Sequence, residues 1–281
     1  MKILVTGATG TVGRHVVDRL LAGGVQVRAL TRRPEHAGLP AQVEVVGADL
    51  EQPDTLEAAF QDVDQLYLVV SGATEEVVDL ARKAQVRRIV VLSTATAAID
   101  GDMIGGFHRA AEKVVENSGL AWTHIRPGMF AANLLDWADA IRTEGVVRAP
   151  HEAARQAPLH EVDVAEVAAT ALLADGHDGR IHTLSGPQCL TKSEQVAAIS
   201  QAIGRPVSFE ELTPEQWRAS VQDALPSYVA EWMLGLWAKA VDNPEPVLPT
   251  VQEVLGRPPR SLAEWASDHA ADFRSEAAPA H

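Results

Sequence analysis

Residues 1–14 read MKILVTGATGTVGR, and this stretch decides the fold. Ile3, Leu4 and Val5 form an apolar run that is too short for a helix, which is typical of a buried parallel strand. Three glycines follow, and from Arg14 onward apolar residues recur at helical spacing. A strand, a glycine-rich turn and a helix in this order predict a dinucleotide-binding loop. Glycines let the backbone approach a pyrophosphate, and the N–H groups at the helix start hold its charge.

The loop TGATGTVG has the spacing GxxGxxG rather than GxGxxG. In this form it resembles the short-chain dehydrogenase/reductase superfamily, in its extended or atypical branch. The alternative is a glycine turn in an α/β protein that binds no nucleotide. We predict that this loop contacts the cofactor through Gly7, Thr9, Gly10, Thr11 and Val12.

The end of the second expected strand, residues 25–30, is followed by Arg32 and Arg33. In dinucleotide-binding folds an acid at this position holds the 2′-hydroxyl of NAD and repels a 2′-phosphate. This chain places two guanidinium groups there instead, and guanidinium pairs well with phosphate. The sequence therefore predicts NADP(H) in preference to NAD(H). The alternative is that both arginines are solvated loop residues.

Further short apolar strands are expected over 43–46, 65–70 and 88–92, in alternation with helices. This alternation predicts an α/β fold of the Rossmann type, a doubly wound parallel sheet with helices on both faces. Ligands of such sheets lie at the carboxyl ends of the strands. Asp49 there would accept from the adenine amino group or cap a helix beginning near Pro53–Asp54, and the two roles are compatible. The remaining cofactor contacts predicted at these ends are Leu50, Val70, Ser71, Gly72, Ser93 and Thr94.

Residues 103–113, MIGGFHRAAEK, are expected to carry the chemistry. Most members of the superfamily that the loop resembles place a Tyr here and a Lys four residues on, often with a Glu four further along. The Tyr donates a proton and the Lys lowers its pKa. With the register fixed on Glu112, His108 takes the place of the Lys and Ile104 that of the Tyr. Neither tyrosine of the chain has a Lys four residues on, so the dyad is absent.

His108 and Glu112, together with SGLAWTHIRPGMF at 118–130 and Asn133, resemble the NmrA-like branch of atypical short-chain dehydrogenases/reductases. That branch includes NADPH-dependent quinone, dye and flavonoid-type reductases, and also redox-sensing regulators. The resemblance implies that His108 is catalytic as a proton donor, or that it bonds the nicotinamide ribose. The alternative is a surface histidine. The resemblance also implies a substrate pocket lined by Pro127, Gly128, Met129, Phe130 and Asn133.

The chain is expected to divide into an NAD(P)-binding Rossmann domain, residues 1–150, and a smaller C-terminal substrate lobe, mainly residues 151–281. Residues 180–186 are predicted to return as a strand to the main sheet. In the lobe, Thr191–Glu194 reads as a capping box before a helix. Four tryptophans fall in the last third, and we assign most of them to helix packing rather than to a cover over an aromatic substrate. They are Trp217, Trp232, Trp237 and Trp265.

Composition excludes several classes of protein. A net charge of −14 argues against nucleic acid as a partner. One cysteine allows no intrachain disulfide, the first strand stands at the N-terminus where a signal peptide would be, and no apolar stretch is long enough to span a bilayer. HExxH, Cys/His clusters, GxSxG and a P-loop ending are missing from the sequence, so we expect no metal. A cytoplasmic monomer or homodimer without a membrane partner is expected.

Two functions fit the sequence. The first is an NADPH-dependent oxidoreductase that transfers hydride to a quinone, enone or carbonyl of a small aromatic molecule. Quinone-like acceptors need little acid help, because the hydroquinone anion is already stable, so the missing Tyr is tolerable. The second is a catalytically silent NADP(H)-binding redox sensor that acts through a protein partner. The apolar segment Pro127–Phe130 suits a small molecule and favours the enzyme.

Overall fold

The computed structural model describes residues 1–274, which divide into two compact units. Unit 1 comprises residues 1–128, 161–184 and 249–258, and unit 2 comprises residues 129–160, 185–248 and 259–274. The predicted boundary at residue 150 differs from this division, whereas the predicted return of residues 180–186 to the main sheet agrees with β8, Arg180–Leu184. The chain leaves unit 1 at residue 129 and returns at 161, because the helix that begins there packs in unit 1 and the strand that follows it joins the unit 1 sheet.

Unit 1 is built on a seven-stranded sheet whose neighbouring strands all pair in parallel. The strand order is β3-β2-β1-β4-β5-β6-β8, so the direction of winding reverses between β1 and β4. This confirms the predicted Rossmann-type fold, in which ligands bind at the carboxyl ends of the strands beside that reversal. The strands are β1 Lys2–Val5, β2 Gln26–Thr31, β3 Glu44–Gly47, β4 Gln65–Val69, β5 Arg88–Leu92, β6 Ala121–Pro127 and β8 Arg180–Leu184.

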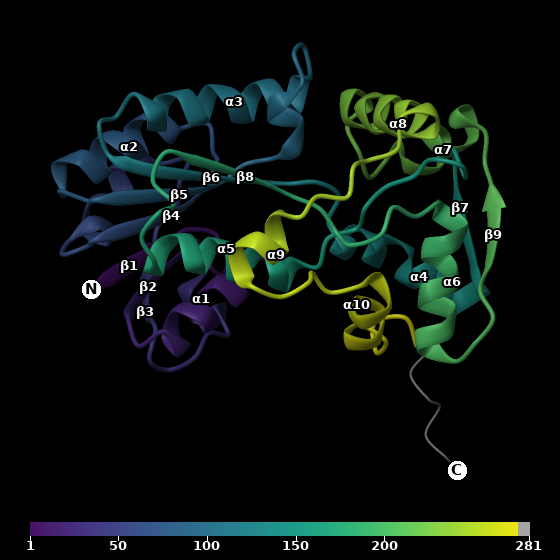
Figure 1. The fold of residues 1–281 in the computed structure, drawn as a ribbon, viewed down its shortest axis with the longest axis horizontal. Helices are drawn as coiled ribbons and strands as arrows, with labels where there is room; N and C mark the ends of the chain where they lie inside the picture. Colours follow the sequence, from purple (N-terminus) through teal and green to yellow (C-terminus); the bar gives the residue numbers. More distant parts are fainter. Residues whose placement is uncertain (275–281) are drawn as a thin grey trace. The chain divides into compact units, whose positions relative to one another are not determined.

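Helices cover both faces of this sheet: α2 and α3 lie on one face, and α1 and α5 pack together on the other (Figure 1). The strands between them are buried on both sides, which is why Ile3, Leu4 and Val5 read as one apolar run. The helices of unit 1 are α1 Gly13–Ala22, α2 Thr74–Lys83, α3 Met103–Glu116, α5 Glu161–Leu173 and α9 Thr250–Leu255. Short 3₁₀ turns lie at η1 Pro34–His36, η2 Pro53–Thr55, η3 Glu57–Phe60 and η4 Ala95–Ala98.

The prediction of a helix beginning near Pro53–Asp54 is wrong, because the structure has the two 3₁₀ turns η2 and η3 there. A buried arginine from a neighbouring strand explains the difference. Arg28 Nη1 donates to the carbonyl oxygens of Ala59 at 2.9 Å and Gln61 at 2.6 Å. These carbonyls therefore find a partner without the continuing backbone bonds of an α-helix.

Unit 2 combines a two-stranded parallel sheet with helices around an apolar core that contains Trp265 and Phe273. The predicted capping box is confirmed, since Thr191 and Glu194 bond reciprocally at the start of α6. The strands are β7 Val146–Ala149 and β9 Ser208–Glu211. The helices are η5 Ala131–Trp137, α4 Ala138–Glu144, α6 Lys192–Ile203, α7 Pro214–Val221, α8 Ser227–Asp242 and α10 Leu262–Asp268.

The tryptophans of the last third divide evenly between two environments. Trp217 and Trp265 are buried in apolar clusters, as expected of packing residues. Trp232 and Trp237 are half-buried, and the ring of Trp237 packs edge-on against Trp217 with centroids 4.9 Å apart. Packing thus accounts for at least three of the four rings.

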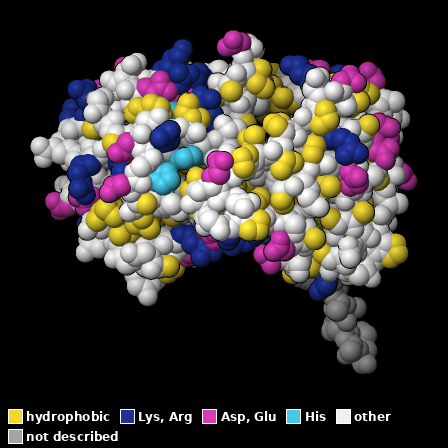
Figure 2. Space-filling view, in the orientation of Figure 1, with side chains coloured by type: hydrophobic (Ala, Val, Ile, Leu, Met, Phe, Trp, Pro, Cys, Tyr) yellow, Lys and Arg dark blue, Asp and Glu magenta, His cyan; other side chains and the backbone are white. Residues whose placement is uncertain are grey.

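Within residues 1–274 no helix has the length and apolarity to cross a membrane. On the face shown in Figure 2, Lys and Arg side chains are interspersed with Asp and Glu. The charges on that face therefore do not form a surface of one sign. Binding along a nucleic-acid backbone requires a continuous basic surface.

Candidate functional site

The glycine loop lies between β1 and α1 in unit 1, at the reversal of strand order. Gly7 has a φ of +60°, and a Cβ built on it would stand 2.8 Å from Val69 Cγ2. A Cβ on Gly13 would stand 2.0 Å from the carbonyl oxygen of Gly7. Both positions therefore require glycine, the first for backbone conformation and the second for close approach of α1 to the loop that follows β1.

The beginning of α1 is open to an anion. Its N-cap is Val12, and among the described residues no side chain caps it. Gly7, Gly10 and Thr11 are exposed there, so the positive end of the helix faces solvent, while the Gly10 N–H donates within the loop to the Gly7 carbonyl at 2.9 Å. Thr9 lies in the same loop, where its carbonyl oxygen accepts from Arg14 Nη2 at 2.9 Å. A dinucleotide pyrophosphate suits this open helix start. A side chain at Gly13 would push the loop away from α1, because its Cβ would meet backbone atoms of Gly7 and Ala8.

The remaining predicted cofactor residues follow the carboxyl ends of β2, β3, β4 and β5, which the sheet brings to one edge. Arg32 and Arg33 follow β2 and are both exposed. Leu50 and Val70 pack partly buried against the core of unit 1. Thr94 is engaged as the N-cap of η4, where its hydroxyl accepts from the Thr96 N–H.

Asp49 holds its own turn instead of capping a helix. Its Oδ1 accepts from the Glu51 N–H at 3.1 Å, and the N-cap of η2 is Gln52. The capping role that the sequence allowed for Asp49 is therefore wrong, because no α-helix begins at Pro53–Asp54 within the described chain.

Glu51 is a residue of this edge that the sequence analysis missed. Its Oε1 accepts from the Gly72 N–H at 3.0 Å and so connects the loops that follow β3 and β4. Beside Gly72, the hydroxyl of Ser71 is buried and has no hydrogen-bond partner among the described residues. No local pattern could have revealed Glu51, because the contact joins residues 21 positions apart.

His108 lies one turn into α3, half-buried, with its ring edge-on to Phe107. Burial lowers the pKa of His108, although the nearby Glu112 carboxylate opposes this. The neutral imidazole therefore predominates at neutral pH. Its Nδ1 is buried and has no hydrogen-bond partner in the described part of the chain. His108 is thus suited to hydrogen bonding with a ligand, and only a minor protonated fraction serves as an acid.

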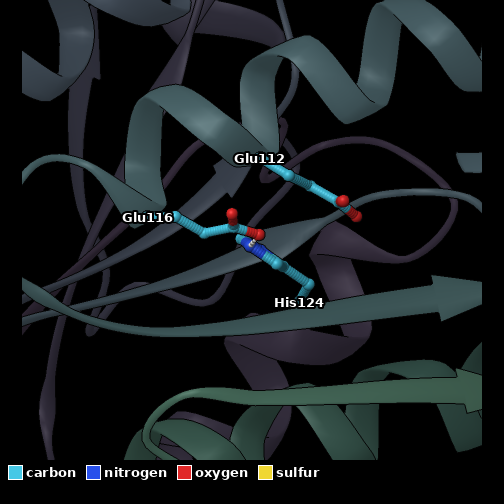
Figure 3. A group of neighbouring side chains, drawn as sticks. All are labelled: Glu112, Glu116 and His124. Carbon is cyan, nitrogen blue, oxygen red and sulfur yellow. Dashed lines mark hydrogen bonds and ion pairs between the residues drawn. The ribbon is translucent and has the colours of Figure 1, made fainter.

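Behind His108, α3 and β6 are joined by a buried ion-pair network. Glu112 accepts two bonds from Arg126, at 2.8 Å from Nε and 2.5 Å from Nη2. Arg109 bridges Glu112 at 3.1 Å and Glu116 at 2.5 Å. Figure 3 shows Glu116 meeting the ring of His124, whose Nε2 lies 3.3 Å from Oε1, with Glu112 one turn away from Glu116 on α3.

Charge balance explains why this cluster is structural. Glu112, Glu116 and His124 offer three atoms within 4.8 Å of one another, a spacing that suits a metal ion. Two guanidinium groups, from Arg109 and Arg126, already neutralise the two carboxylates. A cation would have to displace them, so we assign the cluster to packing of α3 on β6.

Glu112 stays ionised despite being fully buried. Burial by itself would raise the pKa of Glu112. The hydrogen bonds from Arg126 outweigh the effect of burial, together with the nearby Ser93 and His124 and the positive charge of Arg126. The pKa of Glu112 is therefore lowered to about 2. Ser93, predicted to contact the cofactor, thus also borders this network. The network fixes the helix that carries His108.

Neither tyrosine takes the place of the missing acid on α3. Tyr67 is fully buried in β4, where burial raises the pKa of its phenol further. Tyr228 is exposed on α8 of unit 2. Ile104, in the place of the usual Tyr, is a half-buried residue of the first turn of α3.

The five predicted substrate-pocket residues fall on both sides of a unit boundary. Pro127 ends β6 and Gly128 donates its N–H to the Leu184 carbonyl at 2.9 Å, so both belong to unit 1. Met129, Phe130 and Asn133 belong to unit 2, where Met129 packs against the apolar core and Asn133 is exposed.

Comparison with known proteins shows the family. A family model described as NAD(P)H-binding matches residues 7–175. A (4-alkanoyl-5-oxo-2,5-dihydrofuran-3-yl)methyl phosphate reductase from Streptomyces griseus subsp. griseus is 41% identical, over 98% of this chain and 100% of its own length. An NAD(P)H azoreductase from Xenophilus azovorans is 36% identical, over 96% of this chain and 99% of its own.

Among solved structures, the chain is similar to an NADPH-dependent quinone oxidoreductase from Escherichia coli complexed with NADPH. The TM-score is 0.82 at 26% identity, over 95% of this chain and 99% of that one. The match of fold, glycine loop and full-length relatives leads to one conclusion. The chain belongs to the NAD(P)H-binding, NmrA-like family of atypical short-chain dehydrogenases/reductases.

Proposed function

We propose that this protein is an NADPH-dependent oxidoreductase that reduces a quinone, a conjugated enone or the carbonyl of a small aromatic molecule. The observation that carries the proposal is the glycine loop, in which Gly13 abuts the Gly7 carbonyl and leaves the start of α1 open. Full-length relatives named as reductases support an oxidoreductase. An acceptor with an electron-poor double bond is supported by the dihydrofuranone and azo compounds in their names.

In this function the chain's own residues bind and orient the cofactor and the acceptor. The glycine loop holds a pyrophosphate, and Arg32 and Arg33 pair with a 2′-phosphate. NADPH supplies hydride when bound. His108 bonds the nicotinamide ribose or gives a proton to the reduced carbonyl oxygen. Gly128, Met129 and Phe130, with Pro127 and Asn133, are our candidates for contact with the acceptor.

Oxidation of NADPH by the purified protein tests this function. The panel contains quinones, conjugated enones including a 2-acyl butenolide, aryl ketones, azo compounds and triarylmethane dyes. We expect saturable turnover with at least one class, and none with the protein omitted or with Gly13→Ala. NADPH binding with no turnover on any class would contradict the enzyme and support a redox sensor that acts through a protein partner.

Replacing Arg32 and Arg33 with Asp is expected to weaken NADPH binding by about 100-fold and to leave NADH within about threefold. The reason is that two charge-assisted contacts to the 2′-phosphate become repulsion, whereas NADH has no such phosphate. Fluorescence titration of both cofactors measures the effect.

The matched control reverses the same charges on exposed α2, at Arg82 and Lys83. It is expected to change neither cofactor by more than about twofold, because these side chains are solvated. Equal losses of NADPH and NADH in the Arg32/Arg33 variant would disprove the 2′-phosphate assignment.

His108→Ala is expected to lower kcat for an aryl ketone by about 100-fold, and kcat for a quinone by less than about threefold. Only the ketone develops an alkoxide that needs a proton donor. Single-turnover kinetics on both acceptors measure this difference. Lys113→Ala, an exposed change on the same helix, is the control. Unchanged rates on both acceptors would make His108 a surface residue without a catalytic role.

A further inference from the structure

Lys192 is the one buried lysine among the five in the chain, all of which the structure describes. It stands in the first turn of α6 in unit 2 and is 2% exposed. Its Nζ lies 3.8 Å from the centroid of the Trp237 ring on α8 and has no hydrogen-bond partner among residues 1–274. An amine without a partner in such a place is uncommon, because each unmet polar group in a core costs free energy.

A second unmet polar atom lies on the same helix. Gln195 is fully buried and three residues from Lys192, so the two side chains share a face of α6. The Gln195 amide nitrogen donates to the Leu190 carbonyl at 3.1 Å, but its Oε1 accepts from no group in the described chain. A donor and an acceptor are therefore both left open on consecutive turns.

The surroundings of Lys192 are aromatic on one side and acidic on the other. Trp217 and Trp237 belong to the apolar cluster formed with Leu234 and its neighbours on α7 and α8. The charged group that acts on the Lys192 amine is the carboxylate of Glu211 on β9. A free anion would be repelled here, so the open amine suits a neutral partner.

We propose that Lys192 is a reactive amine, a covalent site for small neutral aldehydes. Lys192 Nζ attacks the carbonyl carbon and forms a C–N bond, the amine protons and the carbonyl oxygen leave as water, and an imine remains. No oxidant or reductant is required. The hydroxyl of the intermediate carbinolamine would donate to Gln195 Oε1, and the indole of Trp237 would cover the adduct.

The acid–base properties of Lys192 support this chemistry. Burial lowers the pKa of Lys192 to about 7, although the charge of Glu211 opposes the shift. The face of Trp237 favours the charged amine as well. About half of the amine is then neutral near pH 7, against about 1 in 3,000 for an ordinary lysine. A desolvated amine with a lowered pKa is the usual form of a Schiff-base lysine.

Reductive methylation of the intact protein tests the proposal. Formaldehyde is the probe, cyanoborohydride traps the imine, and peptide mass spectrometry reads each lysine separately between pH 6 and 10. We expect Lys192 to be labelled at least tenfold faster than Lys83, Lys113 and Lys239 at pH 7. Its rate should level off above pH 8, while theirs rise about tenfold per pH unit.

Two variants complete the experiment. Lys192→Met should lose this adduct, keep the labelling of the other lysines and melt within a few degrees of the parent protein, because methionine fills a similar space without an amine. Trp237→Leu should move the midpoint of the Lys192 profile to lower pH, because the ring no longer favours the charged amine. A Lys192 that stays unlabelled, or whose rate climbs to pH 10 as that of the exposed lysines does, overturns the proposal.

Discussion

Replacing Gly13 with Ala is expected to weaken NADPH binding by at least about 100-fold. The new Cβ would stand 2.0 Å from the Gly7 carbonyl oxygen, where no methyl group fits. The contact is with backbone on both sides, so the loop itself must move away from α1. Pyrophosphate binding depends on the position of the backbone N–H groups of the loop and of the start of α1. Displacing these groups therefore removes the binding of the pyrophosphate. Isothermal titration with NADPH measures the loss, and unfolding in urea measures an accompanying destabilisation of about 1–3 kcal/mol.

Gly106→Ala is the matched control for this change. Gly106 is also helical, but a Cβ there meets no atom within 4 Å. Alanine in this exposed position is expected to leave NADPH binding unchanged and to raise the free energy of unfolding by about 0.5–1 kcal/mol. Gly13→Ala binding NADPH with the parent affinity would show that the cofactor lies elsewhere.

Replacing Glu112 with Gln is expected to lower the free energy of unfolding by about 3–5 kcal/mol. The amide keeps the shape of the side chain but leaves the buried guanidinium of Arg126 without a counter-charge. Differential scanning calorimetry should show the melting temperature falling by about 10 °C. The surface pair Arg148–Glu144 provides the control, because Glu144→Gln breaks an exposed contact of less than about 1 kcal/mol.

The buried pair of Glu112 and Arg126 also predicts how the stability of the protein depends on pH. The pKa of Glu112 is about 2 in the folded protein, below its ordinary value of 4.5. Its contribution is therefore fully present above pH 4.5 and is lost as the pH falls toward 2. The shift corresponds to about 3 kcal/mol. Urea unfolding at a series of pH values should show a shallower acid decline for Glu112→Gln than for the parent protein. Parallel declines would mean that Glu112 is not the titrating group.

The ion-pair network also has a functional consequence. Arg126 and Glu112 fix β6 to α3, and α3 carries His108. A variant of Glu112 that still folds should therefore lose ketone reduction more than quinone reduction, since only the former relies on His108. The stability of the sheet and the placement of the proton donor are connected through one buried pair.

The sequence by itself determined the elements whose signal is local. β1, the glycine loop and α1 follow from a buried run, three glycines and a helical repeat within about two dozen residues. The capping box of α6 could also be predicted from the sequence, because Thr191 and Glu194 hydrogen-bond to backbone groups within one turn. Alternation of strands and helices then allowed only a parallel, doubly wound sheet.

Only the tertiary structure decided which distant residues meet. The 3₁₀ turns after Pro53 depend on a guanidinium from Arg28, and the Glu51 contact to Gly72 crosses from one loop to another. Lys192 looked like an ordinary residue of a helix start, yet packing of α8 buries its amine under Trp237. Burial and pairing depend on partners far along the chain, whereas propensity and capping depend on neighbours. The local sequence was therefore enough to predict the cofactor loop, whereas the partners of the buried charged groups could be known only from the tertiary structure.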